Sequence, residues 1–83
     1  MIPKTEVALS LDARGVLCPI PVLRVSNAIK QLQVGAVLEV VTTDPGSKPD
    51  IEAWTRMTGN ELLSEEEEAG SPAAFRFRIR RVK

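Results

Sequence analysis

Residues 15–21, Gly15-Val16-Leu17-Cys18-Pro19-Ile20-Pro21, predict a transition from a loop to a helix. Proline fixes φ, lacks an amide hydrogen and restricts the preceding residue to extended backbone. We therefore expect Cys18 to lie at or just outside the N-cap of a helix that begins at Pro19. The apolar residues that follow recur every three or four positions, as on the buried face of an amphipathic helix, and they are Val22, Val25, Ile29 and Leu32. This helix is predicted to end near Gln33.

Strand patterns lie on both sides of this helix. Residues 7–11 alternate apolar and small or polar side chains with period two, and turn-forming residues follow at 12–15. After Gly35, which suits a helix C-cap or a turn, residues 36–42 are β-branched and almost uninterruptedly apolar. The first segment is predicted to be a strand, and the second a central strand.

A second helix is predicted over about residues 46–57. Asp44-Pro45 is typical of a helix start, because the carboxylate can accept hydrogen bonds from first-turn amides and proline there gives up no needed donor. Gly59 then offers a stop. One side of this helix carries a stripe that we expect to face the sheet, made of Ile51, Ala53, Trp54, Met57 and Thr58.

The last third of the chain predicts an antiparallel hairpin. Residues 61–68 and 75–80 flank a turn at Gly70-Ser71-Pro72, and the second segment alternates phenylalanine or isoleucine with arginine. The element order is therefore β-α-β-α-β-β. We expect one domain, 1–83, with residues 1–6 as an N-terminal extension. The predicted fold class is α/β, a two-layer sandwich of a four-stranded mixed sheet with two helices on one face, and the strand order stays open.

Composition narrows the classes of function. Eleven Lys and Arg balance eleven Asp and Glu, so no net charge attracts nucleic acid or an anionic membrane. No apolar stretch approaches the roughly 20 residues of a membrane span, and the start of the sequence has no signal-peptide pattern, so we expect a cytoplasmic protein. The single cysteine excludes an internal disulfide, and the absence of histidine excludes an ordinary zinc site or a Cys-His pair.

Cys18 is the candidate reactive residue. Free amides and the positive end of the helix dipole favour a thiolate at a helix N-terminus, so its pKa is predicted to be lowered, although prolines remove donors there. Pro19 and Pro21 are predicted to shape the site. Arg14 and Arg24 could each stabilise a thiolate or persulfide anion, or be an ordinary surface arginine. Most free cysteines are buried structural thiols, but a core thiol needs no such rigid start to a helix.

Charged residues in the closing hairpin allow two interpretations. Residues 65–68 are four glutamates, and arginines occupy positions 76, 78, 80 and 81. Cross-strand ion pairs are the simpler interpretation, and the other is a charged sheet face that docks a protein or, less readily, tRNA phosphates. Direct nucleic-acid binding is disfavoured because the glutamates offset the arginines. Asp44 and Asp50 are interpreted as a cap and a helix-surface residue.

Taken together, the ordered motifs resemble the TusA/SirA family of sulfur-carrier proteins. Cys-Pro-x-Pro alone would be unspecific, but its flanking elements at suitable spacing make the set specific. Asn60 departs from the pattern, because many relatives have histidine after the glycine. The resemblance spans about residues 11–83 and rests on Leu11-Asp12-Ala13-Arg14-Gly15, Cys18-Pro19-Ile20-Pro21, Gly35, Asp44-Pro45, Asp50-Ile51 and the strand from Phe75.

The resemblance implies a two-layer α/β sandwich and a role in sulfur relay. Cys18 would receive sulfur as a persulfide from a donor protein such as a cysteine desulfurase or a rhodanese, and pass it to a downstream acceptor protein. It implies a sulfurtransferase-type carrier with no cofactor beyond the transient persulfide, and it leaves a partner-binding or site-shaping role open for Asp44 and Asp50. The relay could serve tRNA thiolation, cofactor biosynthesis or sulfur oxidation. The alternative is a non-catalytic interaction or regulatory module with a structural cysteine.

Overall fold

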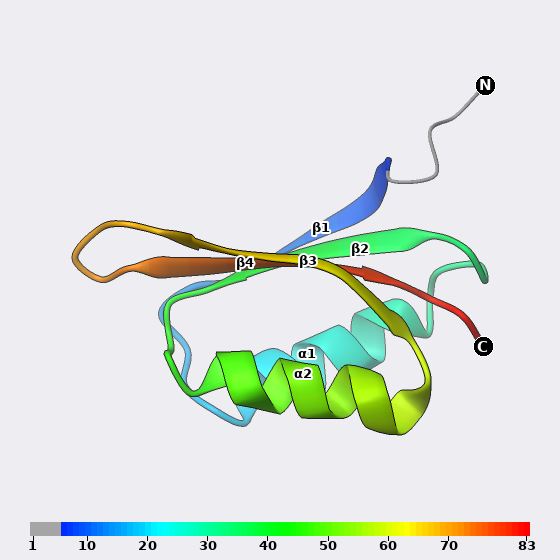
Figure 1. Ribbon diagram of the computed structural model, residues 1–83, viewed down its shortest axis with the longest axis horizontal. Helices are drawn as coiled ribbons and strands as arrows, with labels where there is room; N and C mark the ends of the chain where they lie inside the picture. The colour runs from blue at the N-terminus through cyan, green and yellow to red at the C-terminus, as the bar shows by residue number, and fades with distance from the viewer. Residues whose placement is uncertain (1–5) are drawn as a thin grey trace.

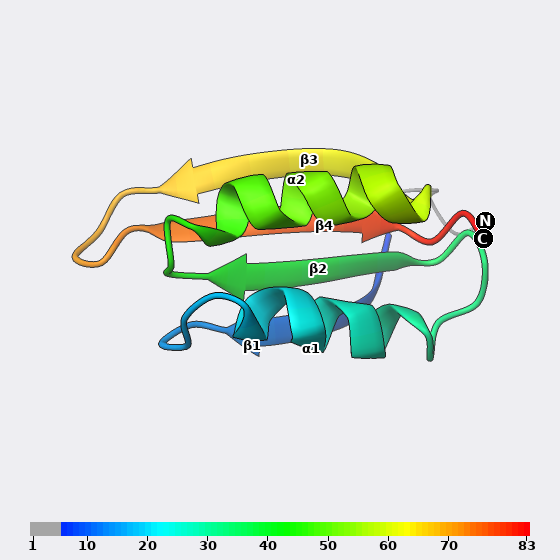
Figure 2. The ribbon, with the colours of Figure 1, turned by 90° about the horizontal axis from the view of Figure 1, so that it is seen from below.

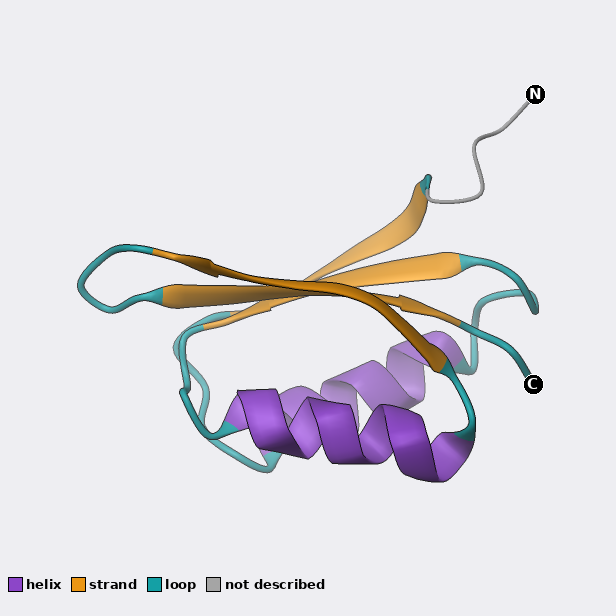
Figure 3. Ribbon diagram, viewed as in Figure 1, coloured by secondary structure: helices purple, strands orange, loops and turns teal. Residues whose placement is uncertain are grey.

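Two layers make up the fold in the computed structural model, which describes residues 6–83. A sheet forms one layer, and two helices lie together against one of its faces (Figure 1; Figure 3). The predicted order β-α-β-α-β-β is confirmed, while the predicted N-terminal extension, residues 1–6, lies outside the described residues except for Glu6. The elements are β1 (Val7–Ala13), α1 (Ile20–Ile29), β2 (Val37–Thr42), α2 (Ser47–Thr58), β3 (Glu61–Glu68) and β4 (Ala74–Arg80).

The C-terminal strand lies inside the sheet, whose order is β1-β2-β4-β3. β1 and β2 are parallel because a helix crosses between them, whereas β3 and β4 follow one another through a short turn and pair antiparallel. β4 also pairs antiparallel with β2, so the sheet is mixed. Figure 2 shows α1 on the β1 and β2 side of the sheet and α2 on the β3 and β4 side. Each helix thus covers one half of the same face.

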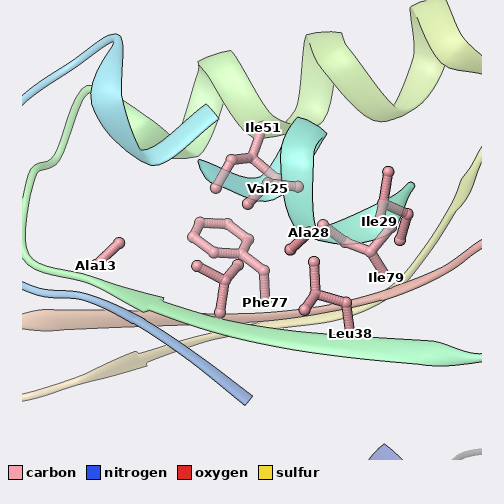
Figure 4. Close-up of a cluster of buried hydrophobic side chains, with 9 residues drawn as sticks. Ala13, Val25, Ala28, Ile29, Leu38, Ile51, Phe77 and Ile79 are labelled. Carbon is pink, nitrogen blue, oxygen red and sulfur yellow. The ribbon is translucent and has the colours of Figure 1, made fainter. Parts of the chain in front are cut away.

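The hydrophobic core lies between the sheet and the helices (Figure 4). The register pairs Leu38 of β2 with Ile79 of β4 and Val40 with Phe77, and all four side chains are buried. Burying a large apolar side chain stabilises the fold by about 1.5–3 kcal/mol, so these contacts hold both helices on the sheet. The helix residues buried against them are Val25, Ala28, Ile29 and Ile51.

Helix α1 ends at Ile29, four residues before the predicted end near Gln33. The next amides reach back only three residues, from Gln31 N to Ala28 O at 3.0 Å and from Leu32 N to Ile29 O at 3.2 Å. Leu32 still packs against the core, and its carbonyl accepts from Nη1 of Arg81 at 2.5 Å. Arg81 also donates from Nη1 to the carbonyl of Lys30 at 3.3 Å, so this side chain holds the segment that follows α1.

Helix α2 presents a different face to the sheet from the predicted one. Its buried residues are Ser47, Ile51 and Thr55, spaced four apart. Met57, predicted to face the sheet, is 85% exposed, and Thr58 is exposed as well. The prediction followed apolar identity along the helix, but buried threonine and serine can satisfy their hydroxyls locally, as Thr55 does on Glu52 O at 2.8 Å.

The outer face of the sheet, away from the helices, carries a ladder of ion pairs. The predicted pairing between the last two strands is confirmed for Arg76 with Glu68, the one residue of the glutamate run 65–68 in the ion pairs described, and Arg80 pairs with Glu61. Glu39 of β2 is an unexpected partner of Arg76 and Arg78. Glu65 departs from the prediction, because it pairs in register with Phe77 and lies on the helix side of the sheet. There a hydrogen bond with Glu52 of α2 raises the pKa of the Glu65 carboxyl. The pairs of this ion-pair ladder are Arg76 with Glu39 (2.7 Å) and Glu68 (2.9 Å), Arg78 with Glu39 (3.0 Å), and Arg80 with Glu61 (3.0 Å).

Candidate functional site

The loop that carries Cys18 joins β1 to α1 and is held by the loop that follows β2. Gly15 has a left-handed φ of 82°, which glycine adopts without steric penalty, and its N–H donates to Thr43 Oγ1 at 3.0 Å. The Cys18 N–H donates to Asp44 Oδ2 at 2.7 Å, while the other oxygen of Asp44 accepts from the Gly46 N–H at 3.1 Å. Asp44 therefore fixes the backbone of Cys18 against the start of α2.

Helix α1 begins directly after the Cys18-Pro19 dipeptide. Its N-cap is Pro19, whose carbonyl accepts from the Leu23 N–H at 3.1 Å. The Cys18–Pro19 peptide bond is cis, Pro19 is exposed, and Pro21 is buried in the first turn. Cys18 thus lies just outside the N-cap, which confirms the predicted position of the thiol relative to the helix.

The thiol of Cys18 is exposed and donates a hydrogen bond to Oδ2 of Asp50, in the first turn of α2. This bond is the main cause that raises the pKa of the Cys18 thiol, and desolvation and the charges of Asp50 and Asp44 act in the same direction. The predicted lowering of the pKa by the α1 dipole is therefore wrong. A thiolate here would face two carboxylates, and Pro21 removes one of the amides that would have stabilised it.

An apolar groove opens beside the thiol, with a volume of about 430 Å³. Both helices contribute to it, so Cys18 and Asp50 meet at a surface that neither helix forms alone. Further apolar side chains are exposed next to the thiol in sequence, and Leu17 is 71% exposed. The groove is lined by Cys18, Pro19, Val22, Asp50, Ala53, Trp54, Met57 and Thr58.

The two arginines considered as anion stabilisers gather at Asp12. The Arg14 guanidinium donates two hydrogen bonds to that carboxylate, at 2.9 Å and 3.0 Å, and the Arg14 backbone N–H donates a third at 3.0 Å; together they hold the pKa of Asp12 at about 2. Arg24 donates from Nη1 to the Asp12 carbonyl at 3.3 Å. Among residues 6–83, neither arginine has a described contact with Cys18, so their action on a thiolate or persulfide stays a prediction.

Asp50 is the residue that sequence reasoning missed as a partner of the thiol, since it was interpreted as a helix-surface residue. It lies 32 positions from Cys18, and only the fold brings the two together. One signal in the sequence points to it: Asp50, Trp54 and Met57 recur at intervals of four and three. They form a second face of α2, which borders the groove, beside the buried face that contacts the sheet. Trp54, predicted to be core, packs partly against the core and also lines this groove.

Two further features of the described residues concern other kinds of site. Within residues 6–83, no three histidine, cysteine, aspartate or glutamate side chains are grouped so that they could hold a metal ion. Neither of the two helices described there has the length and apolar character needed to cross a membrane. The groups that the described site presents are the thiol of Cys18, the carboxylates of Asp44 and Asp50, and the apolar groove.

Comparison with known proteins identifies the family. Residues 9–81 match the family model described as sulfurtransferase TusA. The sulfur carrier protein TusA of Allochromatium vinosum is 44% identical over 71 residues, which are 86% of this chain and 90% of that protein. The longer protein YrkF of Bacillus subtilis is 43% identical over 63 residues, which are 76% of this chain and 34% of YrkF.

A solved structure agrees with the fold. The SirA-like protein of Desulfitobacterium hafniense superposes with a TM-score of 0.72, over 90% of this chain and 99% of that one, at 24% sequence identity. This likeness concerns the arrangement of the sheet and helices, and the match of the family model concerns nearly the whole described sequence. The chain therefore belongs to the TusA family.

Proposed function

We propose that this protein, a sulfur carrier of the TusA family, accepts sulfane sulfur as a persulfide on Sγ of Cys18 and relays it to a partner protein. The observation that carries the proposal is the position of the only cysteine. Its thiol is exposed, its backbone is fixed by Asp44, and it lies at the edge of an apolar groove. A buried structural cysteine would not expose its thiol beside such a groove.

The transfer consists of two thiol exchanges. In the first, the Cys18 thiolate attacks the outer sulfur of a donor persulfide R–S–SH, the donor S–S bond breaks, R–S⁻ leaves, and Cys18–S–SH forms. In the second, the thiolate of the acceptor attacks the outer sulfur of Cys18–S–SH, so that the acceptor becomes the persulfide and Cys18 returns as a thiolate. The sulfur passes on at an unchanged oxidation level, so the proposal includes no metal and no organic cofactor.

The partners are proposed to be proteins that carry reactive thiols. A cysteine desulfurase or a rhodanese is the proposed donor, and the acceptor is proposed to act in tRNA thiolation, cofactor biosynthesis or sulfur oxidation in the cytoplasm. The apolar groove supports protein partners, because exposed apolar surface of this kind is typical of contact sites. Direct binding of nucleic acid is not proposed, since the arginines of β4 are engaged in the ion-pair ladder.

Loading with sulfur tests the proposal. The wild type is incubated with a sulfane-sulfur donor, such as a polysulfide or a rhodanese with thiosulfate, and intact mass is measured. We expect a gain of sulfur on the wild type that a thiol reductant reverses, and no gain on Cys18→Ser. The serine variant should keep its fold, because the thiol is exposed and its loss opens no cavity.

Two results would contradict the proposal. A wild type that no persulfide donor can load would favour the alternative, an interaction module whose cysteine has no role in transfer. A folded Cys18→Ser protein that still passes sulfur from donor to acceptor would show that the relay does not pass through this thiol. Circular dichroism of both proteins separates loss of loading from loss of fold.

A further inference from the structure

Every charged group with a described contact or influence on the Cys18 thiol is a carboxylate. Asp50 of α2 accepts the thiol hydrogen bond, and Asp44 of the loop before α2 accepts from the backbone N–H of the same residue. The two nearest arginines in sequence donate to Asp12 instead: Arg14 to its carboxylate and Arg24 to its backbone carbonyl. The thiol therefore lies in a locally negative and otherwise apolar setting.

We propose that Asp50 is the positioning and specificity-determining residue of the carrier: it holds Cys18 as a thiol in the free protein and disfavours exchange with anionic sulfur compounds. This inference rests on the proposed function, because it concerns which donors and acceptors exchange sulfur with Cys18. The partner that fits is an apolar protein segment bearing a basic side chain, which enters the groove and pairs with Asp50.

Charge and surface chemistry argue for that partner. The groove beside the thiol is mostly apolar, with Val22, Ala53, Trp54 and Met57 in its lining and Asp50 as its acidic group. A basic side chain that paired with Asp50 would draw the carboxylate away from the thiol and cancel its repulsion of a thiolate. The proton leaves Cys18 for solvent or for the departing thiolate of the donor, and the exchange then follows the two steps given above.

The role of Asp50 in the fold is small enough to test it by substitution. The N-cap of α2 is Gly46, and in the described chain no side chain hydrogen bond caps this helix, so Asp50 is not needed there as a cap. Its described hydrogen bond is the one from Cys18. Asp50→Asn preserves shape and a hydrogen-bonding side chain while removing the charge, and Asp50→Glu preserves the charge on a longer side chain.

The experiment compares two thiol reagents of equal chemistry and opposite charge. The methanethiosulfonates with a trimethylammonium-ethyl and a sulfonato-ethyl group both form a disulfide with Cys18 and release methanesulfinate. At low ionic strength we expect the cationic reagent to react with the wild type on the order of tenfold faster than the anionic one, after each rate is divided by that with a small free thiol. In Asp50→Asn this ratio should approach one, and the thiol should titrate at lower pH.

Matched variants make the result specific. Glu66→Gln removes one exposed negative charge from β3 and should leave the ratio unchanged, while Asp50→Glu should retain the preference for the cationic reagent. A ratio near one in the wild type, or one that Asp50→Asn changes no more than Glu66→Gln does, would overturn the inference. Loading by a persulfide donor is measured separately: loading without charge selectivity refutes only this inference, and selectivity without loading refutes the proposed function on which it rests.

Discussion

The outer face of the sheet and the surface around Cys18 differ in whether their charged side chains are paired with groups of opposite charge. On the sheet, each arginine of the ion-pair ladder has a carboxylate within 3.0 Å, and Glu39 serves two of them. Around Cys18, two carboxylates face a thiol and a backbone amide, and no cation contacts them among the hydrogen bonds described for residues 6–83. Within residues 6–83, the arginines of the ion-pair ladder are therefore neutralised by neighbouring carboxylates, whereas Asp44 and Asp50 beside Cys18 have no described cationic partner.

The surface around Cys18 and the outer face of the sheet also differ in how much apolar surface they expose. Leu17 and Met57 are both exposed: Leu17 precedes Cys18 in the sequence, and Met57 lines the mainly apolar groove beside the thiol. On the sheet face, the arginines of β4 are instead engaged in ion pairs with Glu39, Glu61 and Glu68. Association with a partner gains most where apolar area is exposed and polar groups are few, so the two faces predict opposite results when they are altered.

The largest effect is expected from removing apolar contact at the Cys18 surface. In a double variant, Leu17→Gln with Met57→Gln, transfer of sulfur from a persulfide-loaded desulfurase or rhodanese should slow by on the order of thirtyfold. Two exposed anchor residues at an interface each contribute about 1 kcal/mol or more to association. The measurement is the single-turnover rate of sulfur transfer, followed by intact mass.

The control for this variant is Val34→Gln. Val34 is 64% exposed but lies outside the groove, in the connection between α1 and β2, so the same change of side chain should leave transfer unaltered. Loading of the double variant by a small polysulfide should also be unaltered, because that reaction needs no docking. Equal slowing in the double variant and in Val34→Gln would remove the difference between the two surfaces.

Much of the fold could be predicted because local patterns determine it. The alternation in β4 and the apolar run of β2 give the strands, and the double proline locates the start of α1. The strand order could not be read from the sequence, since β4 inserts between β2 and β3 by contacts across the whole chain. Arg81, near the other end of the chain, binds the carbonyl of Leu32 in the segment after α1, and this long-range contact could not be read from local patterns either.

The candidate site was predictable in position but not in its electrostatics. The spacing of Cys18 and its prolines predicted a thiol just outside a helix N-cap, and that is where it lies. The prediction of a lowered thiol pKa took into account only α1, the helix that follows the cysteine. The thiol instead bonds Asp50 of the other helix, so the direction of its pKa depends on how α1 and α2 pack side by side. Cys18 and Asp50 are 32 positions apart, so local sequence patterns do not reveal their contact.

A moderate effect, on stability alone, is expected from Glu39→Gln on the sheet face. The Glu39 side chain is only 13% exposed and accepts hydrogen bonds from Arg76 and Arg78. Its neutralisation leaves two neighbouring guanidinium groups without their shared partner, which should lower the free energy of unfolding by about 1–2 kcal/mol. Urea denaturation measures this loss.

The Glu39→Gln variant is expected to keep the function of the wild type. Sulfur loading of Cys18 and the reaction rates with the charged thiol reagents should match those of the wild type at a temperature where both proteins are folded. The same substitution at the more exposed Glu61, which pairs with Arg80, should lower the free energy of unfolding by no more than about 0.5 kcal/mol. A Glu39 variant that loads poorly while folded would show that the sheet face takes part in sulfur transfer.

The smallest effect concerns Arg14, which lies at the border between the two surfaces. It stands four residues before Cys18, yet its side chain bonds Asp12 and both line a groove on the outer face of the sheet. This pairing lowers the pKa of Asp12 from 3.8 to about 2, so its contribution to stability is present above pH 3.8 and is lost as pH falls through about 2. In Arg14→Gln, NMR titration should show the pKa of Asp12 rising toward 3.8, while the titration of Cys18 stays in place. If the Cys18 titration moved instead, Arg14 would belong to the thiol surface, as its place in the sequence allows.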